Sequence, residues 1–399
     1  MDILIHPCTL QGEITVIPSK SQAHRLLICA AFADTPTKII CKDTNRDIDA
    51  TADCLRALGA DIVRTETGYS VFPAKTIPST AVLNCCESGS TLRFMLPITG
   101  ALGVDALFLM EGRLPHRPLS PLWEELERMG CRLSRPTENT IRCQGKLHPG
   151  NYSIDGGISS QFITGLLLAL CLMEEESNLT ITGKVESRPY IDLTRQVISL
   201  FHVDPDHPGM QKFQSPGAIT VEGDWSNGAF FLAAKHLQFN DGLEIHGLRT
   251  DSVQGDRAAS YLIPKLCQEP CTIDASDIPD LVPVLSITAA ANHGAVFHNV
   301  QRLRIKESDR VASTIAMIEA LGGRADATQD TLTVYGSGFI GGSVDACNDH
   351  RIAMSAAIAS TVCKQDVVIF GAECVKKSYP RFWEEFSRLG GSYEQYLRR

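Results

Sequence analysis

The chain has 399 residues, of which 44% are hydrophobic and 21% are charged, as in folded proteins rather than disordered ones. At roughly one domain per 150 residues, this length predicts two or three domains. The formal net charge of −9 argues against nucleic acid or an acidic membrane surface as a partner. The longest apolar run, Phe162 to Met173, is shorter than the roughly 20 residues that a membrane span needs.

The cysteines and the first residues of the chain indicate its compartment. Fourteen cysteines are spread irregularly, and the closest pairs, Cys85 with Cys86 and Cys267 with Cys271, do not form two CxxC halves. We therefore expect reduced, mostly buried thiols. The first residues lack a basic region followed by a long apolar stretch, so we expect a cytoplasmic protein.

Taken in chain order, the expected elements repeat. Each unit has an amphipathic helix that ends at Gly or a similar stop, then short strands, a small-residue turn and a more apolar helix. The successive pairs are ATADCLRALGADIV with SGSTLRFMLPITGAL, PLWEELERMGCRL with DGGISSQFITGLLLAL, DLTRQVISLFHVD with EGDWSNGAFFLAAKHL, RAASYLIPKLC with DIPDLVPVLSITAA, and VASTIAMIEALGGRA with NDHRIAMSAAIAS. A sixth copy is split, with RFWEEFSRLGG near the C-terminus and PSKSQAHRLLICAAF near the N-terminus. A period of about 50 residues predicts a modular fold of related units.

Six helix-and-strand units, the last completed by the first residues, predict an α/β protein of two domains with three units each. We place one domain at residues 19–222 and the other at residues 1–18 plus 223–399. A cleft between two such domains is where ligands are usually held.

The fourth unit is shortened. Its stretch between helix end and next turn runs only from Leu266 to Asp277, whereas the first unit runs from Gly59 to Glu87. We interpret this as the loss of a hairpin, which would leave one sheet short and a strand exposed at its edge.

The turns before the apolar helices collect unusual residues. They hold Lys20, Ser21, Arg25, Gly89, Ser90, Arg93, Ser159, Ser160, Gln161, Asp280, Lys306, Glu307, Arg310, Asp349, His350 and Arg351. A Ser/Gly turn that opens a helix presents free N–H groups and the positive end of the helix dipole, which suits phosphate or carboxylate. Several such turns in one cleft would bind a polyanion.

Each feature also has a structural interpretation. Ser21 and Ser90 could only cap helices, and Lys306 with Arg310 could form a solvated, ion-paired helix face. His350 could be a hydrogen-bonded structural histidine, and Arg117 a surface-loop arginine. Because these residues recur at equivalent places in the repeat, their joint occurrence favours an anion site.

Motifs for other chemistry are missing from the sequence. There is no GxxxxGK[ST], no GxGxxG after a strand, no GxSxG, no HExxH and no His cluster. We therefore expect a reaction that uses neither a metal nor a cofactor.

Seven segments carry a resemblance. PSKSQAHR, DGGISSQF, SRPYID, DIPD, RIKESDR, NDHRIAM and KKSYP, in that order, closely resemble the signature segments of the 5-enolpyruvylshikimate-3-phosphate synthase family over nearly the whole chain. The resemblance implies an inside-out α/β barrel of two domains that closes on shikimate 3-phosphate and phosphoenolpyruvate. It implies an enzyme of the shikimate pathway, which leads to aromatic amino acids. We expect a monomer. Many family members are inhibited by glyphosate.

The resemblance also implies the binding residues. Those for shikimate 3-phosphate are Lys20, Ser21, Arg25, Ser159, Ser160, Gln161, Ser187, Tyr190, Asp280 and Lys306. Those for phosphoenolpyruvate are Lys20, Gly89, Arg117, Gln161, Arg310, Arg351 and Lys377. Both substrates are polyanions, which matches the cationic set, because Arg grips carboxylate or phosphate in a fixed plane and Lys acts as a point charge.

Four residues are assigned catalytic roles as a hypothesis. Asp280 would accept the proton of the shikimate 5-hydroxyl, and Glu307 would exchange a proton at the methylene carbon of phosphoenolpyruvate. Lys20 would assist the hydroxyl and the departing phosphate, with His350 close to that phosphate.

Two residues depart from the family pattern. Glu87 stands before SGST where Asn is common, and Arg302 stands where a substrate-contacting Asn is usual. Gly89 occupies the position where a larger side chain would press on phosphoenolpyruvate or glyphosate.

Two alternatives stay open. A UDP-N-acetylglucosamine enolpyruvyl transferase would share the repeats, but that family has a loop cysteine and a Lys-Asn pair, whereas here Ser21 follows Lys20. A non-catalytic homologue that binds shikimate phosphate is suggested by Glu87, Arg302 and the short fourth unit. Both proton-transfer carboxylates, Asp280 and Glu307, argue against it.

Overall fold

The computed structural model describes residues 1–239 and 241–397, and these form two compact units. One unit is Pro18–Glu222, and the other combines Met1–Ile17 with the described residues from Gly223 onward. The chain therefore passes from one unit to the other twice, after Ile17 and after Glu222. Pro18 belongs to the first of these units, one residue earlier than the boundary we expected.

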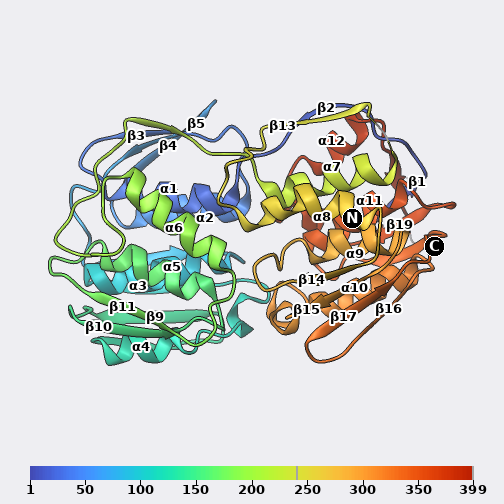
Figure 1. Ribbon diagram of the computed structural model, residues 1–399. Helices are drawn as coiled ribbons and strands as arrows, with labels where there is room; N and C mark the ends of the chain where they lie inside the picture. The colour runs from blue at the N-terminus through green and yellow to red at the C-terminus, as the bar shows by residue number, and fades with distance from the viewer. Residues whose placement is uncertain (240, 398–399) are drawn as a thin grey trace. The chain divides into compact units, whose positions relative to one another are not determined.

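The Pro18–Glu222 unit contains three sheets and six α-helices among its described residues (Figure 1). Its helices are α1 (Lys20–Ala31), α2 (Arg46–Ala57), α3 (Gly89–Leu102), α4 (Leu122–Arg128), α5 (Ser160–Leu170) and α6 (Arg188–Leu200), with a 3₁₀ turn η1 (Leu114–His116). Its strands form the sheets β12-β3-β5-β4, β6-β7-β9-β8 and β10-β11. Their bounds are β3 (Thr37–Ile40), β4 (Asp61–Thr65), β5 (Gly68–Phe72), β6 (Thr80–Asn84), β7 (Asp105–Leu109), β8 (Cys131–Ser134), β9 (Thr140–Gly145), β10 (Asn151–Asp155), β11 (Asn178–Thr182) and β12 (Ala218–Thr220).

The second unit has the same plan, with three sheets and six α-helices in its described part. Its helices are α7 (Trp225–Leu237), α8 (Ala259–Leu266), α9 (Val282–Ala291), α10 (Arg310–Ala320), α11 (His350–Ser360) and α12 (Phe382–Arg388), and its 3₁₀ turns are η2 (Gly255–Ala258), η3 (Gln301–Ile305) and η4 (Ala372–Lys377). Its sheets are β18-β19-β1-β20, β14-β15-β17-β16 and β13-β2. Their strands are β1 (Ile3–His6), β2 (Gly12–Thr15), β13 (Leu243–His246), β14 (Cys271–Asp274), β15 (Ala295–His298), β16 (Arg324–Ala327), β17 (Thr331–Tyr335), β18 (Gly342–Asp345), β19 (Val367–Phe370) and β20 (Ser392–Gln395).

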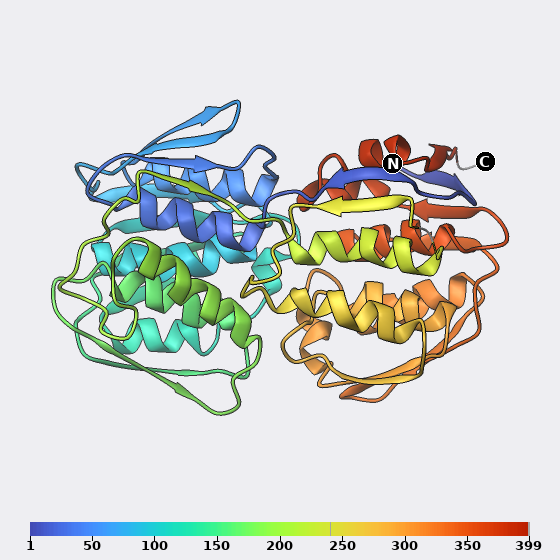
Figure 2. The same ribbon diagram turned by 45° about the horizontal axis from the view of Figure 1, so that its top comes forward.

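In each unit the most apolar helices lie inside and the strands lie outside, as Figure 2 shows. Helices α3, α5, α9 and α11 are buried along almost their whole length, because their sequences are apolar on every side. The prediction of an inside-out α/β architecture is therefore confirmed. None of the helices in the described residues is both long and apolar enough to cross a membrane.

The N-terminal strand completes a sheet made by the C-terminal residues. Strand β1 lies between β19 and β20 and is antiparallel to both, so that Leu4 faces Val368 on one side and Glu394 on the other. The first and last parts of the chain therefore fold together, as a split repeat requires.

The shortening of the fourth sequence repeat is confirmed, and the third sequence repeat also lacks a hairpin. In the fourth sequence repeat, the only strand between α8 and α9 is β14. In the second sequence repeat, three strands, β8, β9 and β10, lie between α4 and α5. Between α6 and α7 the described residues form only β12, and residues 201–217 contain no strand. As a result β10-β11 and β13-β2 are two-stranded parallel sheets.

Helices α3 and α5 approach each other closely at Gly165. A Cβ atom at this position would lie 2.2 Å from the carbonyl oxygen of Arg93 and 2.9 Å from Cγ of Pro97. Glycine therefore sets the distance between these two buried helices.

We predict that Gly165→Ala lowers the stability of the protein by about 1–3 kcal/mol, because the methyl group overpacks a contact with backbone. The matched control is Gly228→Ala in α7, where the nearest atoms to the added methyl group belong to side chains, the methyl groups of Leu248 at 2.9 and 3.0 Å and Cγ2 of Val16 at 3.3 Å. Thermal unfolding followed by circular dichroism checks this prediction. Equal melting temperatures for Gly165→Ala and the wild type would contradict it.

Candidate functional site

Three buried helices of the Pro18–Glu222 unit begin with a serine cap. Ser19 Oγ accepts a hydrogen bond from the Gln22 N–H at 3.4 Å, and Ser88 Oγ accepts one from the Thr91 N–H at 3.2 Å. Ser159 caps α5 in the same way. The interpretation of Ser21 and Ser90 as the caps is therefore wrong, because both lie inside the first turn. Both serines lie at the N-terminal ends of their helices, where the helix dipole is positive.

Lys20, the first residue of α1, is paired with a carboxylate. Its Nζ atom lies 2.9 Å from Oδ2 of Asp47 at the start of α2, and both side chains are 19% exposed. The carboxylate thus holds the ammonium group at the N-terminal ends of two neighbouring helices.

Arg25 lies one turn into α1 and is almost fully buried. Its Nη1 donates to the Ser21 carbonyl at 2.6 Å, its Nε donates to Thr194 Oγ1 at 2.8 Å, and its Nη2 donates to the Tyr190 carbonyl at 3.1 Å. Burial lowers the pKa of Arg25 to about 10. The guanidinium therefore ties α1 to α6 and fixes the backbone of the two predicted site residues Ser21 and Tyr190.

A second set of side chains joins the starts of α3 and α5. Gln161 Nε2 donates to Ser90 Oγ at 3.0 Å, and Gln161 Oε1 accepts from Arg93 Nη1 at 2.7 Å. Arg117 approaches the same place, since a Cβ atom on Gly89 would lie 2.6 Å from its Nη1. Two guanidinium groups and a glycine backbone thus meet beside a helix N-terminus, where an anion is favoured.

Ser160 and Ser187 occupy the starts of two helices. Ser160 is the first residue of α5 and is buried. Ser187 precedes α6 in the left-handed region, with φ 55°, and its carbonyl accepts from the Tyr190 N–H at 3.1 Å. The SRPYID segment is therefore a tight turn that leads into α6.

The second unit contains a network of buried arginines and carboxylates centred on Asp280. Arg310 Nη1 donates to Asp280 Oδ1 at 2.7 Å, and Arg351 Nη2 donates to Asp280 Oδ2 at 2.8 Å. Burial alone would raise the pKa of Asp280, but Arg351 and then Arg310 hold it well below its usual value. Asp280 is therefore an ionised carboxylate gripped on both oxygens.

Arg310 makes two further ion pairs. Its Nη2 donates to Glu307 Oε2 at 2.6 Å, and its Nε donates to Asp349 Oδ2 at 2.9 Å. The side chain is only 1% exposed, so the interpretation of Lys306 and Arg310 as a solvated ion-paired face is wrong. Burial alone would lower the pKa of Arg310, but the three carboxylates raise it well above its usual value.

Lys306 lies next to this network. Burial lowers the pKa of Lys306 to about 8, with the charge of Asp280 opposing the shift and those of Arg302 and Arg310 adding to it. Its charge therefore changes within the physiological to mildly alkaline range. The same relation places Arg302, the residue found where the family usually has Asn, near Lys306.

The last two predicted residues belong to the same unit. His350 begins α11 and is buried, next to Arg351. Lys377, in η4, donates from Nζ to the carbonyl of Asn348 at 3.3 Å. Lys377 therefore contacts the turn that precedes α11, and His350 follows that turn.

Sequence reasoning missed three residues of these networks. Arg93 and Asp349 lie in the turns that we singled out, but neither was assigned a role, and Asp47 was not noticed. Arg93 follows Gly89 at helical spacing, and Asp349 stands directly before a helix, which is the position of a cap. Asp47 had no comparable local signal.

The side chain of Glu87 lies against Gly112. A Cβ atom on Gly112 would lie 1.8 Å from Oε1 of Glu87, so the carboxylate fills the space over that glycine. Gly112 has φ 57°, a region that glycine adopts readily.

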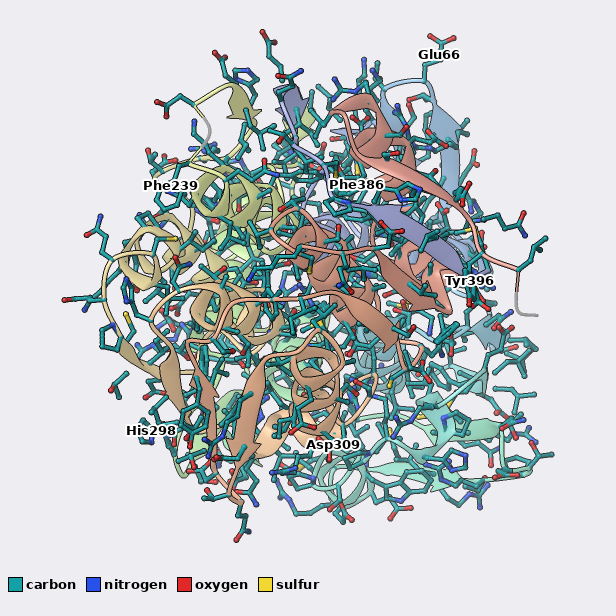
Figure 3. All side chains as sticks on the ribbon, turned by 90° about the vertical axis from the view of Figure 1, so that its right-hand side faces the viewer. Glu66, Phe239, His298, Asp309, Phe386 and Tyr396 are labelled. Atoms are coloured by element: carbon teal, nitrogen blue, oxygen red, sulfur yellow. The ribbon has the colours of Figure 1, made fainter. Side chains whose placement is uncertain are left out.

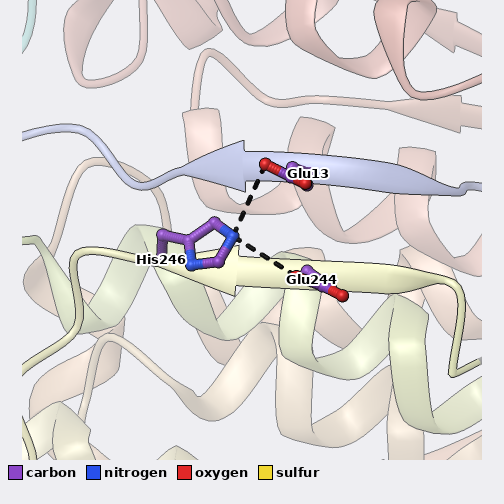
Figure 4. Close-up of side chains that lie close together, drawn as sticks. All are labelled: Glu13, Glu244 and His246. Atoms are coloured by element: carbon purple, nitrogen blue, oxygen red, sulfur yellow. Dashed lines mark ion pairs between the residues drawn. The ribbon is translucent and has the colours of Figure 1, made fainter.

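A group that could hold a metal ion lies on the short β13-β2 sheet of the second unit (Figure 4). Glu13 and Glu244 face each other across the sheet, and His246 Nε2 lies 3.8 Å and 3.6 Å from their carboxylates. All three residues are exposed. Exposed acidic groups of this kind are common without a metal ion, so the arrangement does not by itself indicate a metal site.

Comparison with known proteins places the chain among characterised relatives. The family model described as EPSP synthase (3-phosphoshikimate 1-carboxyvinyltransferase) matches residues 6–267 and 262–386. Proteins named 3-phosphoshikimate 1-carboxyvinyltransferase from Clostridium kluyveri and Clostridium perfringens are 36% and 38% identical, over 99% and 98% of this chain and 98% of theirs. A structure of EPSP synthase from Acinetobacter baumannii, 22% identical, has the same fold, with a TM-score of 0.80 over 99% of this chain and 100% of that one.

Proposed function

The chain belongs to the EPSP synthase (3-phosphoshikimate 1-carboxyvinyltransferase) family, and from this premise we propose that it transfers the enolpyruvyl group of phosphoenolpyruvate to shikimate 3-phosphate. The products are 5-enolpyruvylshikimate 3-phosphate and inorganic phosphate. The reaction is a step of the shikimate pathway, which leads to aromatic amino acids.

The observation that carries this function is that Arg310 and Arg351 both form ion pairs with Asp280. Enolpyruvyl transfer needs fixed cations for a carboxylate and phosphates, together with a carboxylate that can accept a proton. In the structure both arginines bond to Asp280, at 2.7 and 2.8 Å. This arrangement places two arginines and an ionised carboxylate together. Because the arginines lower the pKa of Asp280, it would act as a base only once they turn from it to the substrate anions.

The proposed reaction has two stages. First, a proton is added to the methylene carbon of phosphoenolpyruvate, and the 5-oxygen of shikimate 3-phosphate bonds to the neighbouring carbon while losing its proton. The tetrahedral adduct then loses the methyl proton and phosphate, which restores the double bond. We propose Asp280 as the acceptor of the hydroxyl proton and Glu307 as the group that exchanges the proton at carbon. Lys20 and His350 would stabilise the departing phosphate.

The other residues are proposed to bind the two anions. For shikimate 3-phosphate they are Lys20, Ser21, Ser159, Ser160, Gln161, Ser187, Tyr190, Asp280 and Lys306. For phosphoenolpyruvate they are Lys20, Gly89, Arg117, Gln161, Arg310, Arg351 and Lys377. Arg25 donates to protein oxygens from all three of its nitrogens, which favours a supporting role for it behind Ser21 and Tyr190.

A phosphate-release assay tests the function. With both substrates the pure protein is expected to release phosphate, and with either one alone it is expected to release none. Binding of shikimate 3-phosphate without turnover would instead favour the non-catalytic alternative, and turnover of a UDP-sugar would favour the sister enzyme.

We propose a cytoplasmic monomer as the working form. All fourteen cysteines are free thiols, which suits a reducing compartment. Analytical ultracentrifugation of the pure protein tests the monomer, and a dimer at micromolar concentration would contradict it.

We predict that Asp280→Asn lowers kcat by about 10²–10⁴-fold, because a positioned base is lost. The KM for shikimate 3-phosphate should change by less than about threefold, since the amide keeps the shape of the carboxylate. Steady-state kinetics with both substrates measures these values.

The control for this variant is Asp326→Asn, an exposed carboxylate in β16 that accepts a hydrogen bond from the Tyr335 hydroxyl at 2.8 Å. It should keep the wild-type kcat. A near-normal kcat for Asp280→Asn would remove Asp280 from the mechanism.

We predict that the KM for shikimate 3-phosphate rises above pH 8, by about tenfold per pH unit, because Lys306 then loses the charge that attracts the anion. Since the pKa of Lys306 is lowered to about 8, the ammonium is almost fully charged well below pH 8, half charged near pH 8, and neutral as the pH rises further. Lys306→Arg should stay charged and give a KM that does not rise between about pH 7 and pH 9.5. The same alkaline rise in both proteins would show that another group titrates.

A further inference from the structure

The carboxylate of Asp349 has the most elaborate set of partners in the second unit that no proposed role explains. Asp349 is fully buried and precedes α11 as its N-cap. Its Oδ1 accepts from the Arg351 N–H at 3.0 Å. Its Oδ2 accepts from Ser308 Oγ at 3.0 Å and from Arg310 Nε at 2.9 Å. One side chain therefore joins the turn before α10 to the turn before α11.

The bond to Arg310 Nε determines where the rest of that guanidinium points. The group is planar and rigid, so a fixed Nε–H fixes its plane and the direction of Nη1 and Nη2. Those two nitrogens donate to Asp280 at 2.7 Å and to Glu307 at 2.6 Å. Asp349 thus holds Nε of Arg310 and leaves Nη1 and Nη2 to the two proposed proton-transfer carboxylates.

The other oxygen of Asp349 acts on the second arginine. By capping α11 it fixes the backbone of Arg351, whose side chain donates from Nη2 to Asp280 at 2.8 Å and to Ser226 Oγ at 3.1 Å. Both arginines that grip Asp280 therefore depend on the same carboxylate.

Asp349 is ionised in this arrangement. Burial alone would raise its pKa, but the charge of Arg310 and the hydrogen bond from it lower the pKa below its usual value. A buried carboxylate is stable only with such partners, so Asp349 and Arg310 stabilise each other.

We propose that Asp349 is a positioning residue for enolpyruvyl transfer, which sets the orientation of Arg310 and Arg351 toward phosphoenolpyruvate. This inference rests on the proposed function and assigns a role to a residue that would not touch either substrate. It predicts a larger effect on phosphoenolpyruvate than on shikimate 3-phosphate, because Asp349 bonds directly to Arg310 and to the backbone of Arg351 but reaches Asp280 only through these arginines.

Capping alone does not explain the arrangement. Asp309 caps α10 in the same way, with Oδ1 accepting from the Ala312 N–H at 3.1 Å, but its other oxygen faces Arg304 at 3.4 Å and its side chain is 41% exposed (Figure 3). A helix cap needs one oxygen only. The second oxygen of Asp349 is buried against Arg310 and Ser308 instead of facing solvent.

The test is a set of three variants compared by steady-state kinetics. Asp349→Asn keeps a good capping residue but removes the charge that anchors Arg310. We expect kcat/KM for phosphoenolpyruvate to fall about 10²-fold, as for a misplaced catalytic group. The KM for shikimate 3-phosphate should stay within about twofold of the wild type.

Asp309→Asn is the matched control for capping, and it should keep wild-type values for both substrates. Ser308→Ala removes one donor to Asp349 and leaves the charge in place, so it should raise the KM for phosphoenolpyruvate by only about two- to tenfold. If Asp349→Asn does not fold, Ser308→Ala alone carries the test, and no change in its KM for phosphoenolpyruvate overturns the proposal.

Two other results also overturn it. Asp349→Asn could match the wild type in both KM values and in kcat, or it could weaken both substrates equally while lowering the melting temperature, which is the signature of a purely structural role. Wild-type protein that releases no phosphate would refute the proposed function itself, whatever the variants do. The wild-type assay therefore separates the two failures.

Discussion

The need to compensate the buried charge of Arg310 is the constraint on which the site depends. Arg310 is 1% exposed, and an uncompensated charge at that depth would cost several kcal/mol. Three carboxylates, Asp280, Glu307 and Asp349, meet this need, and each is bonded to a different nitrogen of Arg310. Their positions follow from the geometry of the guanidinium. The cation required for anion binding and the carboxylates required for proton transfer are thus placed by the same bonds.

Most of the fold could be predicted because its signals are local. Apolar helices, Gly stops and small-residue turns recur in the sequence, and the shortened fourth unit shows in its length alone. The missing hairpin of the third sequence repeat was not predicted, because the stretch between the two helices of that repeat is not shortened. Residues 201–217 contain Pro205, Pro208 and Pro216. Proline cannot donate a hydrogen bond to a neighbouring strand, so these prolines argue against a hairpin in this segment, although its length does not. The close approach of α3 and α5 at Gly165 depends on residues far apart in sequence and had no such signal.

The residue types of the candidate site were predictable, but their partners were not. The Ser/Gly turns and basic residues mark helix starts that favour anions. Which serine caps each helix depends on a register difference of two residues, so Ser19 takes the place expected for Ser21. The acceptors of Arg25 on α5 and α6, among them Thr194, lie more than a hundred residues away. Such contacts form only when each unit folds and brings distant helices together. The partners of Asp349 are likewise 41 and 39 residues away, which is why Asp349 was given no role from the sequence.

The most direct measurement is the identity of the product. The pure protein would be incubated with shikimate 3-phosphate and phosphoenolpyruvate labelled with ¹³C at the carbon that bears the phosphate, and the mixture followed by NMR. The account predicts one new enol ether signal that grows in step with inorganic phosphate, with the label bonded to the 5-oxygen of shikimate 3-phosphate. Labelled pyruvate as the only product, or phosphoenolpyruvate that persists unchanged beside bound shikimate 3-phosphate, would contradict it.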